Sequence, residues 1–315
     1  MEIFIVILLF VLGIILILKG GDYFVDAATW IAEVSGIPKF IVGATVVSLA
    51  TTLPELIVSA MAAVDGKVGM AIGNAIGSVT CNTGLVMGIS IVCIPAVVKR
   101  KSFAFKGILM IVSCLSLLLL SLSGELKLGG SLVLLAMFFI FIIENVKSAK
   151  SEISNEKHMI YGKKDIVINA LKFIGGAAGI VIGARLLVDN GSELARIIGI
   201  SESVIGLTVI AIGTSLPELI TTIISIVKKQ GSLGLGNILG ANIIDVTIIL
   251  PVCALLSGGS LPIAKQTFMI DIPVCFAVMG IFVIPTLFKE KLHRVQGIIM
   301  IAVYIAYIIA ISFII

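Results

Sequence analysis

Two short segments of this 315-residue chain place a proline and a glutamate inside long apolar runs. They read ATTLPELIVSA at residues 50–60 and GTSLPELITTI at residues 213–223. Each proline removes a backbone donor and clashes with the carbonyl four residues back, so carbonyl oxygens are freed just before it. Hydroxyl side chains precede the proline and one carboxylate follows it. Carboxylate, carbonyl and hydroxyl oxygens are the ligands that hard cations such as calcium and sodium prefer. The repeated segment therefore predicts an oxygen-lined cation site.

The surroundings of both segments are those of a membrane protein. Hydrophobic residues make up 59% of the chain and charged residues only 13%, with a mean hydropathy of +1.24. A soluble domain of this size would carry about 25% charged residues. Many apolar runs reach the roughly 20 residues that span a bilayer. The start of the chain has no basic region and no small-residue cleavage site of a signal peptide. A polytopic, all-α membrane protein is indicated.

The apolar runs predict ten transmembrane helices. They cover residues 2–34, 38–64, 68–94, 103–122, 128–148, 164–196, 201–227, 233–257, 266–288 and 294–314. The longest polar link, residues 144–165, falls between the fifth and sixth helices. We therefore divide the single membrane domain into a first five-helix repeat (1–150), a loop (151–163) and a second five-helix repeat (164–315).

An internal repeat explains why the segment occurs twice. A shift of 163 residues lays 20–82 over 183–245 without a gap, and 19 of the 63 positions are identical. Pro54 then falls on Pro217 and Glu55 on Glu218. Because each copy has an odd number of helices, the second copy crosses the membrane in the opposite direction. Inverted-topology repeats of this kind build many secondary transporters, whose sites lie near the midplane where the repeats meet.

Three acids are predicted within the spans of the repeats, namely Glu55, Glu218 and Asp245. No lysine or arginine in the same stretches is placed to neutralise them. Each bare charge at the bilayer centre costs about 3 kcal/mol on insertion scales. Protons or metal cations must therefore share the site. The alternative is that the acids are protonated packing residues and the prolines only kink helices, but neither role requires two matched Pro-Glu pairs.

Other matched residues have a structural alternative. The segments GNAIGS (73–78) and GNILGA (236–241) have the small-residue spacing that lets helices pack closely. Close packing does not explain Asn74 and Asn237, because helices that pack through small residues require no amide side chain. Asp26 and Asp189 also match across the repeat, and we interpret them as structural or interfacial residues near the membrane ends.

The basic residues of the links predict the orientation. The links after helices three, five, seven and nine hold Lys99, Arg100, Lys101, Lys106, Lys147, Lys150, Lys157, Lys163, Lys164, Lys228, Lys229, Lys289, Lys291 and Arg294. The links after helices two, four, six and eight hold only Lys67, Lys127, Arg196 and Lys265. The positive-inside rule then makes the first set, including the 144–165 link, cytoplasmic. We expect a multi-pass protein of the cell (plasma) membrane with both termini extracellular.

The repeated motifs resemble those of a known family. GATVVSLATTLPE…GNAIGSVTCN and GLTVIAIGTSLPE…GNILGANIID are similar to the two alpha repeats of sodium/calcium exchangers, within the cation/calcium antiporter superfamily, and most of all to prokaryotic ones. The GNxxE-like signatures of plant vacuolar proton/calcium exchangers are absent. The resemblance covers most of the chain. It implies a secondary active antiporter that exchanges sodium for calcium by alternating access, in which helices one and six move across helices two, three, seven and eight.

The resemblance also implies which residues bind the ions. Calcium would be bound by Glu55, Glu218 and the backbone oxygens of Thr51 and Thr214. Sodium would be bound by the same four residues, the carbonyls of Ser48 and Ala211, and the hydroxyls of Thr52, Ser215 and Ser78. Asn82 and Asp245 would occupy the middle of the site. Two departures from the family pattern are Ala241 in place of the usual serine and Thr52 in place of the more usual serine. The first leaves a proton-coupled or potassium-assisted cation antiporter open as the alternative.

The resemblance implies no covalent chemistry, so we expect no enzyme activity and no cofactor. The expected partners are calcium and sodium ions and the lipid bilayer, with no nucleic acid and no obligate protein partner. An intramembrane aspartyl protease would need a GxGD motif, and the nearest segment, GLGN at 234–237, has Asn237 in place of the catalytic acid. A channel remains a rival, but channels usually gain symmetry from subunits and need no inverted repeat.

Overall fold

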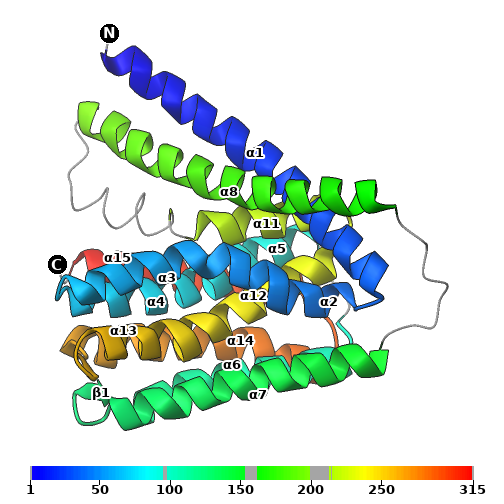
Figure 1. The fold of residues 1–315 in the computed structure, drawn as a ribbon. Helices are drawn as coiled ribbons and strands as arrows, with labels where there is room; N and C mark the ends of the chain where they lie inside the picture. Colours follow the sequence, from blue (N-terminus) through cyan, green and yellow to red (C-terminus); the bar gives the residue numbers. More distant parts are fainter. Residues whose placement is uncertain (1, 95–97, 153–161, 199–212, 214, 314–315) are drawn as a thin grey trace.

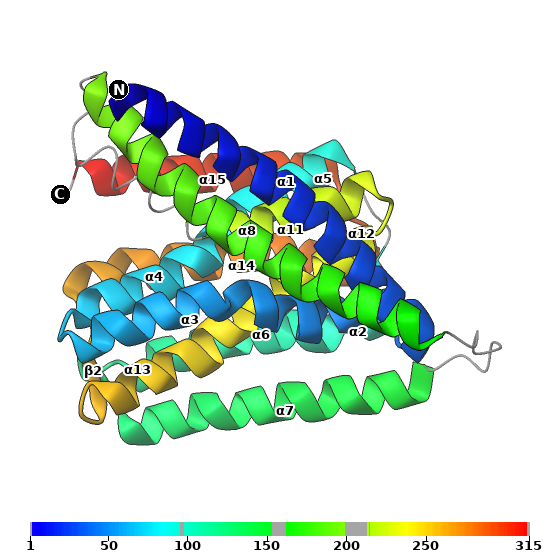
Figure 2. The same cartoon turned by 45° about the horizontal axis from the view of Figure 1, so that its top comes forward.

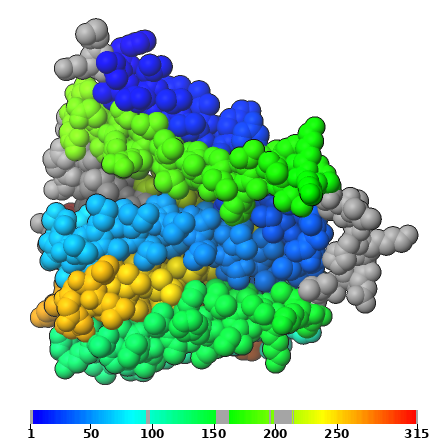
Figure 3. All heavy atoms as spheres, in the orientation of Figure 1, coloured from blue at the N-terminus to red at the C-terminus, as the bar shows by residue number. Residues whose placement is uncertain are grey.

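The computed structural model describes residues 2–94, 98–152, 162–198, 213 and 215–313. Most of its helices run side by side as a bundle, and two long helices cross one side of that bundle obliquely (Figures 1, 2 and 3). Nine helices in the described part of the chain are long and apolar enough to span a membrane, and one shorter apolar helix, α11, accompanies them. The predicted spans agree with these helices, although the first half of the predicted seventh span, 201–227, lies outside the described residues.

The first half of the chain forms α1 (Glu2–Ser35), α2 (Lys39–Val42), η1 (Gly43–Val47), α3 (Ser48–Val64), α4 (Val68–Cys81), η2 (Asn82–Met87), α5 (Gly88–Cys93), α6 (Arg100–Leu120), β1 (Glu125–Lys127) and α7 (Leu128–Glu152). The second half forms α8 (Lys163–Ile197), α11 (Leu216–Val227), α12 (Gly231–Ile244), η4 (Asp245–Ile249), α13 (Leu250–Leu256), β2 (Ser260–Pro262), η5 (Thr267–Asp271), α14 (Ile272–Lys289) and α15 (Arg294–Ser312).

Short π-helical segments, labelled η, interrupt several of the spans. The segments η2 and η4 begin at Asn82 and Asp245, which are matched by the 163-residue shift. A π-helical segment widens a helix locally and is frequent at functional sites. The two prolines of the repeated motif differ in position, because Pro54 lies inside α3 whereas Pro217 lies in the first turn of α11. The helix α3 thus continues through its proline, while α11 begins at its own.

The contact between α1 and α8 carries the repeat symmetry in three dimensions. A Cβ atom on Gly13 would lie 2.9 Å from the carbonyl oxygen of Gly183, and one on Gly183 would lie 2.7 Å from that of Gly13. Gly20 and Gly176 meet in the same way, at 2.8 and 2.7 Å. Under the 163-residue shift, Gly13 corresponds to Gly176 and Gly20 corresponds to Gly183. The two contacts are therefore one contact repeated about a pseudo-two-fold axis, and the inverted repeat is confirmed.

The bundle has two ends, which we name by one residue each. The Lys228 face holds the turn from α11 to α12, the end of α7 and the start of α8 (Figure 1). The Asp65 face holds the turn from α3 to α4, both chain termini and the strands β1 and β2 (Figure 1). These strands pair antiparallel, with Leu126 opposite Leu261, and join the turn before α7 to the turn after α13.

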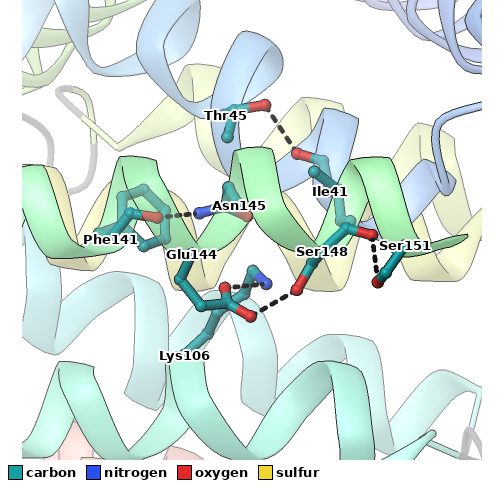
Figure 4. A network of polar contacts seen from close by, with 8 residues as sticks. All are labelled: Ile41, Thr45, Lys106, Phe141, Glu144, Asn145, Ser148 and Ser151. Carbon is teal, nitrogen blue, oxygen red and sulfur yellow. Dashed lines mark hydrogen bonds and ion pairs between the residues drawn. The ribbon is translucent and has the colours of Figure 1, made fainter.

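One charge that the sequence assigned to a polar link is buried instead. Lys106 lies inside α6, with its Nζ 3.2 Å from Oε2 of Glu144 on α7 (Figure 4) and 5.2 Å from the ring centroid of Phe40. The other carboxylate oxygen of Glu144 accepts a hydrogen bond of 2.5 Å from Ser148. A buried lysine needs such a partner, because an unpaired charge is costly to desolvate.

The polar link also begins later than predicted. It was expected to start at residue 144, but α7 continues to Glu152 and carries Lys147 and Lys150 on its last turns. Removing Lys106 from the loop charges leaves the excess of basic residues on the Lys228 face intact.

Candidate cation site between the two repeats

Two buried glutamates, one from each repeat, form the centre of the candidate site. Glu55 lies on α3 and Glu218 in the first turn of α11. Neither oxygen of Glu55 has a hydrogen-bond partner, and Oε2 of Glu218 has none. The other oxygen of Glu218 accepts from the hydroxyl of Thr52 at 3.4 Å, a contact that joins the two repeats.

A second contact between the repeats runs from Thr51 to α12. The Thr51 hydroxyl donates to Oδ1 of Asn237 at 3.1 Å. The helices approach closely here, because a Cβ atom on Gly236 or Gly240 would overlap the carbonyl oxygen of Phe40 or Ala44. In GNILGA the glycines thus serve packing, while the asparagine positions a residue of the site.

The first copy of this motif works differently. Nothing lies within 4 Å of a Cβ atom on Gly73 or Gly77, so close packing does not explain these glycines. The Nδ2 atom of Asn74 donates to the Ser59 hydroxyl at 2.9 Å and to the Glu55 carbonyl at 3.3 Å. Asn74 therefore holds the backbone that carries Glu55.

The other predicted site residues that the structure describes are buried as well, and several of them bring polar atoms that have no hydrogen-bond partner. The atoms without a partner are Ser78 Oγ, Asn82 Oδ1, Ser215 Oγ and both carboxylate oxygens of Asp245. The Ser48 carbonyl lies 3.3 Å from the Thr51 hydroxyl. Ala241 is buried and brings a methyl group where its repeat partner Ser78 brings a hydroxyl. Thr214 and Ala211 lie outside the described residues.

One buried polar residue was missed by the sequence analysis. Asn242 donates through Nδ2 to the Thr83 hydroxyl at 2.8 Å, and its Oδ1 has no partner. Its counterpart under the 163-residue shift is Val79, so a search for matched polar positions passes over it. An amide inside the apolar run ANIIDVTII was the signal that could have identified it.

These buried oxygens require a compensating positive charge. A carboxylate buried without a donor is strongly unfavourable unless a proton or a cation compensates it. Within the described residues, no group of three or more His, Cys, Asp or Glu side chains is arranged to hold a metal ion. A divalent cation here would rely on two carboxylates completed by neutral hydroxyl, amide and carbonyl oxygens, the kind of ligand set that calcium accepts.

Comparison with known proteins identifies the family. The family described as sodium/calcium exchanger protein matches residues 5–146 and again 168–313. The chain belongs to the sodium/calcium exchanger family. The two matched stretches correspond to the two repeats of the fold, so family membership covers both halves of the site.

Relatives and solved structures within the family agree over nearly the whole chain. An uncharacterized membrane protein of Methanocaldococcus jannaschii is 34% identical, with 94% of each chain covered. The sodium/calcium exchanger MaX1 of Methanosarcina acetivorans is 28% identical, with 98% of each covered. A structure of the sodium-calcium exchanger NCX_Mj, soaked with Na⁺ and Sr²⁺, superposes with a TM-score of 0.83 at 32% identity and covers 97% of this chain and 98% of its own.

Proposed function

We propose that this protein is a secondary active antiporter that exchanges sodium for calcium across the membrane by alternating access. The observation that carries the proposal is the pair of buried carboxylates, Glu55 and Glu218, contributed by opposite repeats and lacking protein donors on three of their four oxygens. Sodium and calcium compete for one set of oxygens. When one ion occupies the site the other is excluded, and this exclusion couples the two fluxes. Such a cycle involves no covalent chemistry, which makes the protein a transporter rather than an enzyme.

We propose as ligands the residues that the family resemblance assigns. Calcium is held by Glu55 and Glu218 with backbone oxygens of Thr51 and Thr214. Sodium uses these residues together with the Ser48 and Ala211 carbonyls and the Thr52, Ser215 and Ser78 hydroxyls. Asn82 and Asp245 are proposed to occupy the middle of the site. NCX_Mj, which shares the fold, was studied with Na⁺ and Sr²⁺, and MaX1 is named for sodium and calcium, which supports this choice of ions.

We further propose the plasma membrane as the location, with the Lys228 face in the cytoplasm. The excess of lysine and arginine in the links of that face supports this orientation.

Proton/calcium exchange is the second candidate. It is favoured by the buried methyl group of Ala241 at a position where Ser78 offers a hydroxyl in the other repeat, and by three acids that protons could occupy. Sodium has one neutral ligand fewer in such a site.

Flux measurements in proteoliposomes distinguish the candidates. Purified protein is reconstituted and loaded with either sodium or protons in excess, and calcium uptake is followed after dilution into calcium-containing buffer. We expect uptake driven by the sodium gradient. Uptake driven by the proton gradient alone would overturn the sodium assignment in favour of the second candidate.

A further inference from the structure

An ion pair joins α1 to the end of α11 on the Lys228 face. The Nζ atom of Lys228 lies 2.8 Å from Oδ1 of Asp26 and 3.3 Å from Oδ1 of Asp22, and it also donates to the Asp22 backbone carbonyl at 2.9 Å. Beside this ion pair, Gly21 packs directly against Ile224, whose side chain is only 8% exposed. The seam between α1 and α11 is closed at this end of the molecule.

The repeat symmetry gives each of these residues a counterpart on the Asp65 face. Under the 163-residue shift, Asp22 corresponds to Arg185, Asp26 to Asp189 and Lys228 to Asp65. The turns themselves are equivalent, because Gly66 and its counterpart Lys229 both have a positive φ, of 73° and 59°. The polarity of the ion pair is thus reversed, with the acid on the end of α3 and the base on α8.

This second ion pair is not formed in the present structure. The Arg185 Nε lies 3.7 Å from Asp189 of its own helix, and the Arg185 side chain is 84% exposed. Asp65 lies 3.9 Å from Lys67 and is 62% exposed. The apolar contact is not repeated at this end either, because Met61, the counterpart of Ile224, is 63% exposed.

We infer that these two ion pairs are alternating latches of the transport cycle. The Lys228 latch, with Asp22 and Asp26, stabilises the state in which the Lys228 face is sealed. The Arg185–Asp65 latch forms when α1 and α8 shift to seal the Asp65 face, and the Lys228 latch then opens. The glycine contacts described above join α1 and α8 closely, so one movement opens one seam and closes the other. This inference rests on the alternating access of the proposed function but on no particular ion.

The expected size of each effect follows from the exposure of the groups. Asp26 and Lys228 line a polar hollow of about 810 Å³ with Glu33, Asp165 and Lys172, so water screens their attraction. Ion pairs in such surroundings contribute modestly, and losing one shifts an equilibrium about two- to fivefold.

Cross-linking of cysteine pairs tests the latches. In a Cys93→Ser background, which removes the exposed native thiol, we introduce Asp26→Cys with Lys228→Cys, or Asp65→Cys with Arg185→Cys. A flexible bifunctional thiol reagent is added to the reconstituted protein under several ion gradients. We expect both pairs to cross-link, each link to block flux, and the two yields to change in opposite directions with the ions. Absence of the Asp65/Arg185 link under every condition, with each single cysteine still labelled, would overturn the inference.

Charge removal gives an independent measurement. Lys228→Gln should raise the yield of the Asp65/Arg185 link about two- to fivefold, whereas Lys229→Gln, next to it but outside the ion pair, should leave it unchanged. Equal effects of the two substitutions would overturn the latch. Where Lys228→Gln lowers expression, the exchange Lys228→Asp with Asp26→Lys restores an ion pair and should restore the yield. The cross-linking yield reports which face is closed and does not depend on ion flux. Normal cross-linking yields without any sodium-driven calcium uptake would therefore disprove only the sodium/calcium assignment.

Discussion

Glu55 and Glu218 are the residues on which the proposed exchange depends most directly. Changing either to glutamine keeps the size of the side chain and removes the charge that draws calcium out of water. We expect Glu55→Gln or Glu218→Gln to reduce calcium flux to background, while the protein still inserts, because an amide is less costly to bury than a carboxylate. Flux in proteoliposomes, with size-exclusion chromatography to verify folding, measures both effects.

Asp245 provides the matched control for this experiment. Its repeat counterpart is already the amide Asn82, so Asp245→Asn should leave substantial calcium exchange. Near-normal flux in either glutamine variant, or complete loss in Asp245→Asn alone, would contradict the assigned roles.

The neutral ligands can be tested at Ser78 and Ala241, where one repeat offers a hydroxyl and the other a methyl group. Ala241→Ser adds a hydroxyl at the buried position equivalent to Ser78, and we expect the apparent sodium affinity to rise about two- to tenfold. Ser78→Ala should lower it by a similar factor. The sodium dependence of calcium flux in both variants is the measurement. No change in either variant would mean that these positions do not bind sodium.

At the scale of residues, the duplication is what made a candidate site predictable from the sequence. An acid in a membrane span is conspicuous, and one within a repeated motif is more so, which is why Glu55, Glu218 and Asp245 were singled out, whereas Asn82 was added through the family resemblance. Residues without a polar counterpart could not be identified in this way. Asn242 was missed for that reason, and Lys106 was misplaced because a charge count does not reveal which side of a helix faces the protein.

At the scale of elements, the close contact of α1 and α8 can be tested by substitution of one glycine, with the neighbouring glycine as the control. A Cβ atom on Gly176 would lie 2.7 Å from the Gly20 carbonyl oxygen, whereas nothing lies within 4 Å of one on Gly175. We expect Gly176→Ala to destabilise the protein by about 1–3 kcal/mol, because two backbones must separate. Gly175→Ala should be neutral, or stabilising by up to about 1 kcal/mol, because alanine favours a helix.

Thermal unfolding in detergent measures both glycine variants. A lower melting temperature for Gly175→Ala than for Gly176→Ala would show that the helices do not meet through this contact.

The helices themselves were predictable because their apolar runs match the thickness of the bilayer, and the predicted ends fall within a few residues of the observed ones. The π-helical segments were not predictable, since a widened turn follows from how neighbouring helices and buried polar groups pack together. The extension of α7 to Glu152 was missed for a related reason. A helix can continue into water, and hydropathy alone then ends it too early.

At the scale of the whole molecule, the orientation can be measured directly. In the Cys93→Ser background, Ser123→Cys lies on the Asp65 face and Gly162→Cys on the Lys228 face, and both positions are exposed. We expect a membrane-impermeant thiol reagent to label Ser123→Cys in intact cells and Gly162→Cys only after permeabilisation. The reverse pattern would invert the proposed orientation.

The paired glycine contacts of α1 and α8 also bear on how such a protein can evolve. The pseudo-two-fold axis exchanges one of these contacts for the other, so the pair is the same whichever face is sealed and adds nothing to the free-energy difference between the two states. That difference can arise only where the halves have diverged, as at Asp65 and Lys228 or at Ser78 and Ala241. The duplicated fold thus starts from two balanced states, and substitutions at unmatched positions outside the ion site, such as Asp65 and Lys228, can adjust the resting state while the ion ligands remain unchanged.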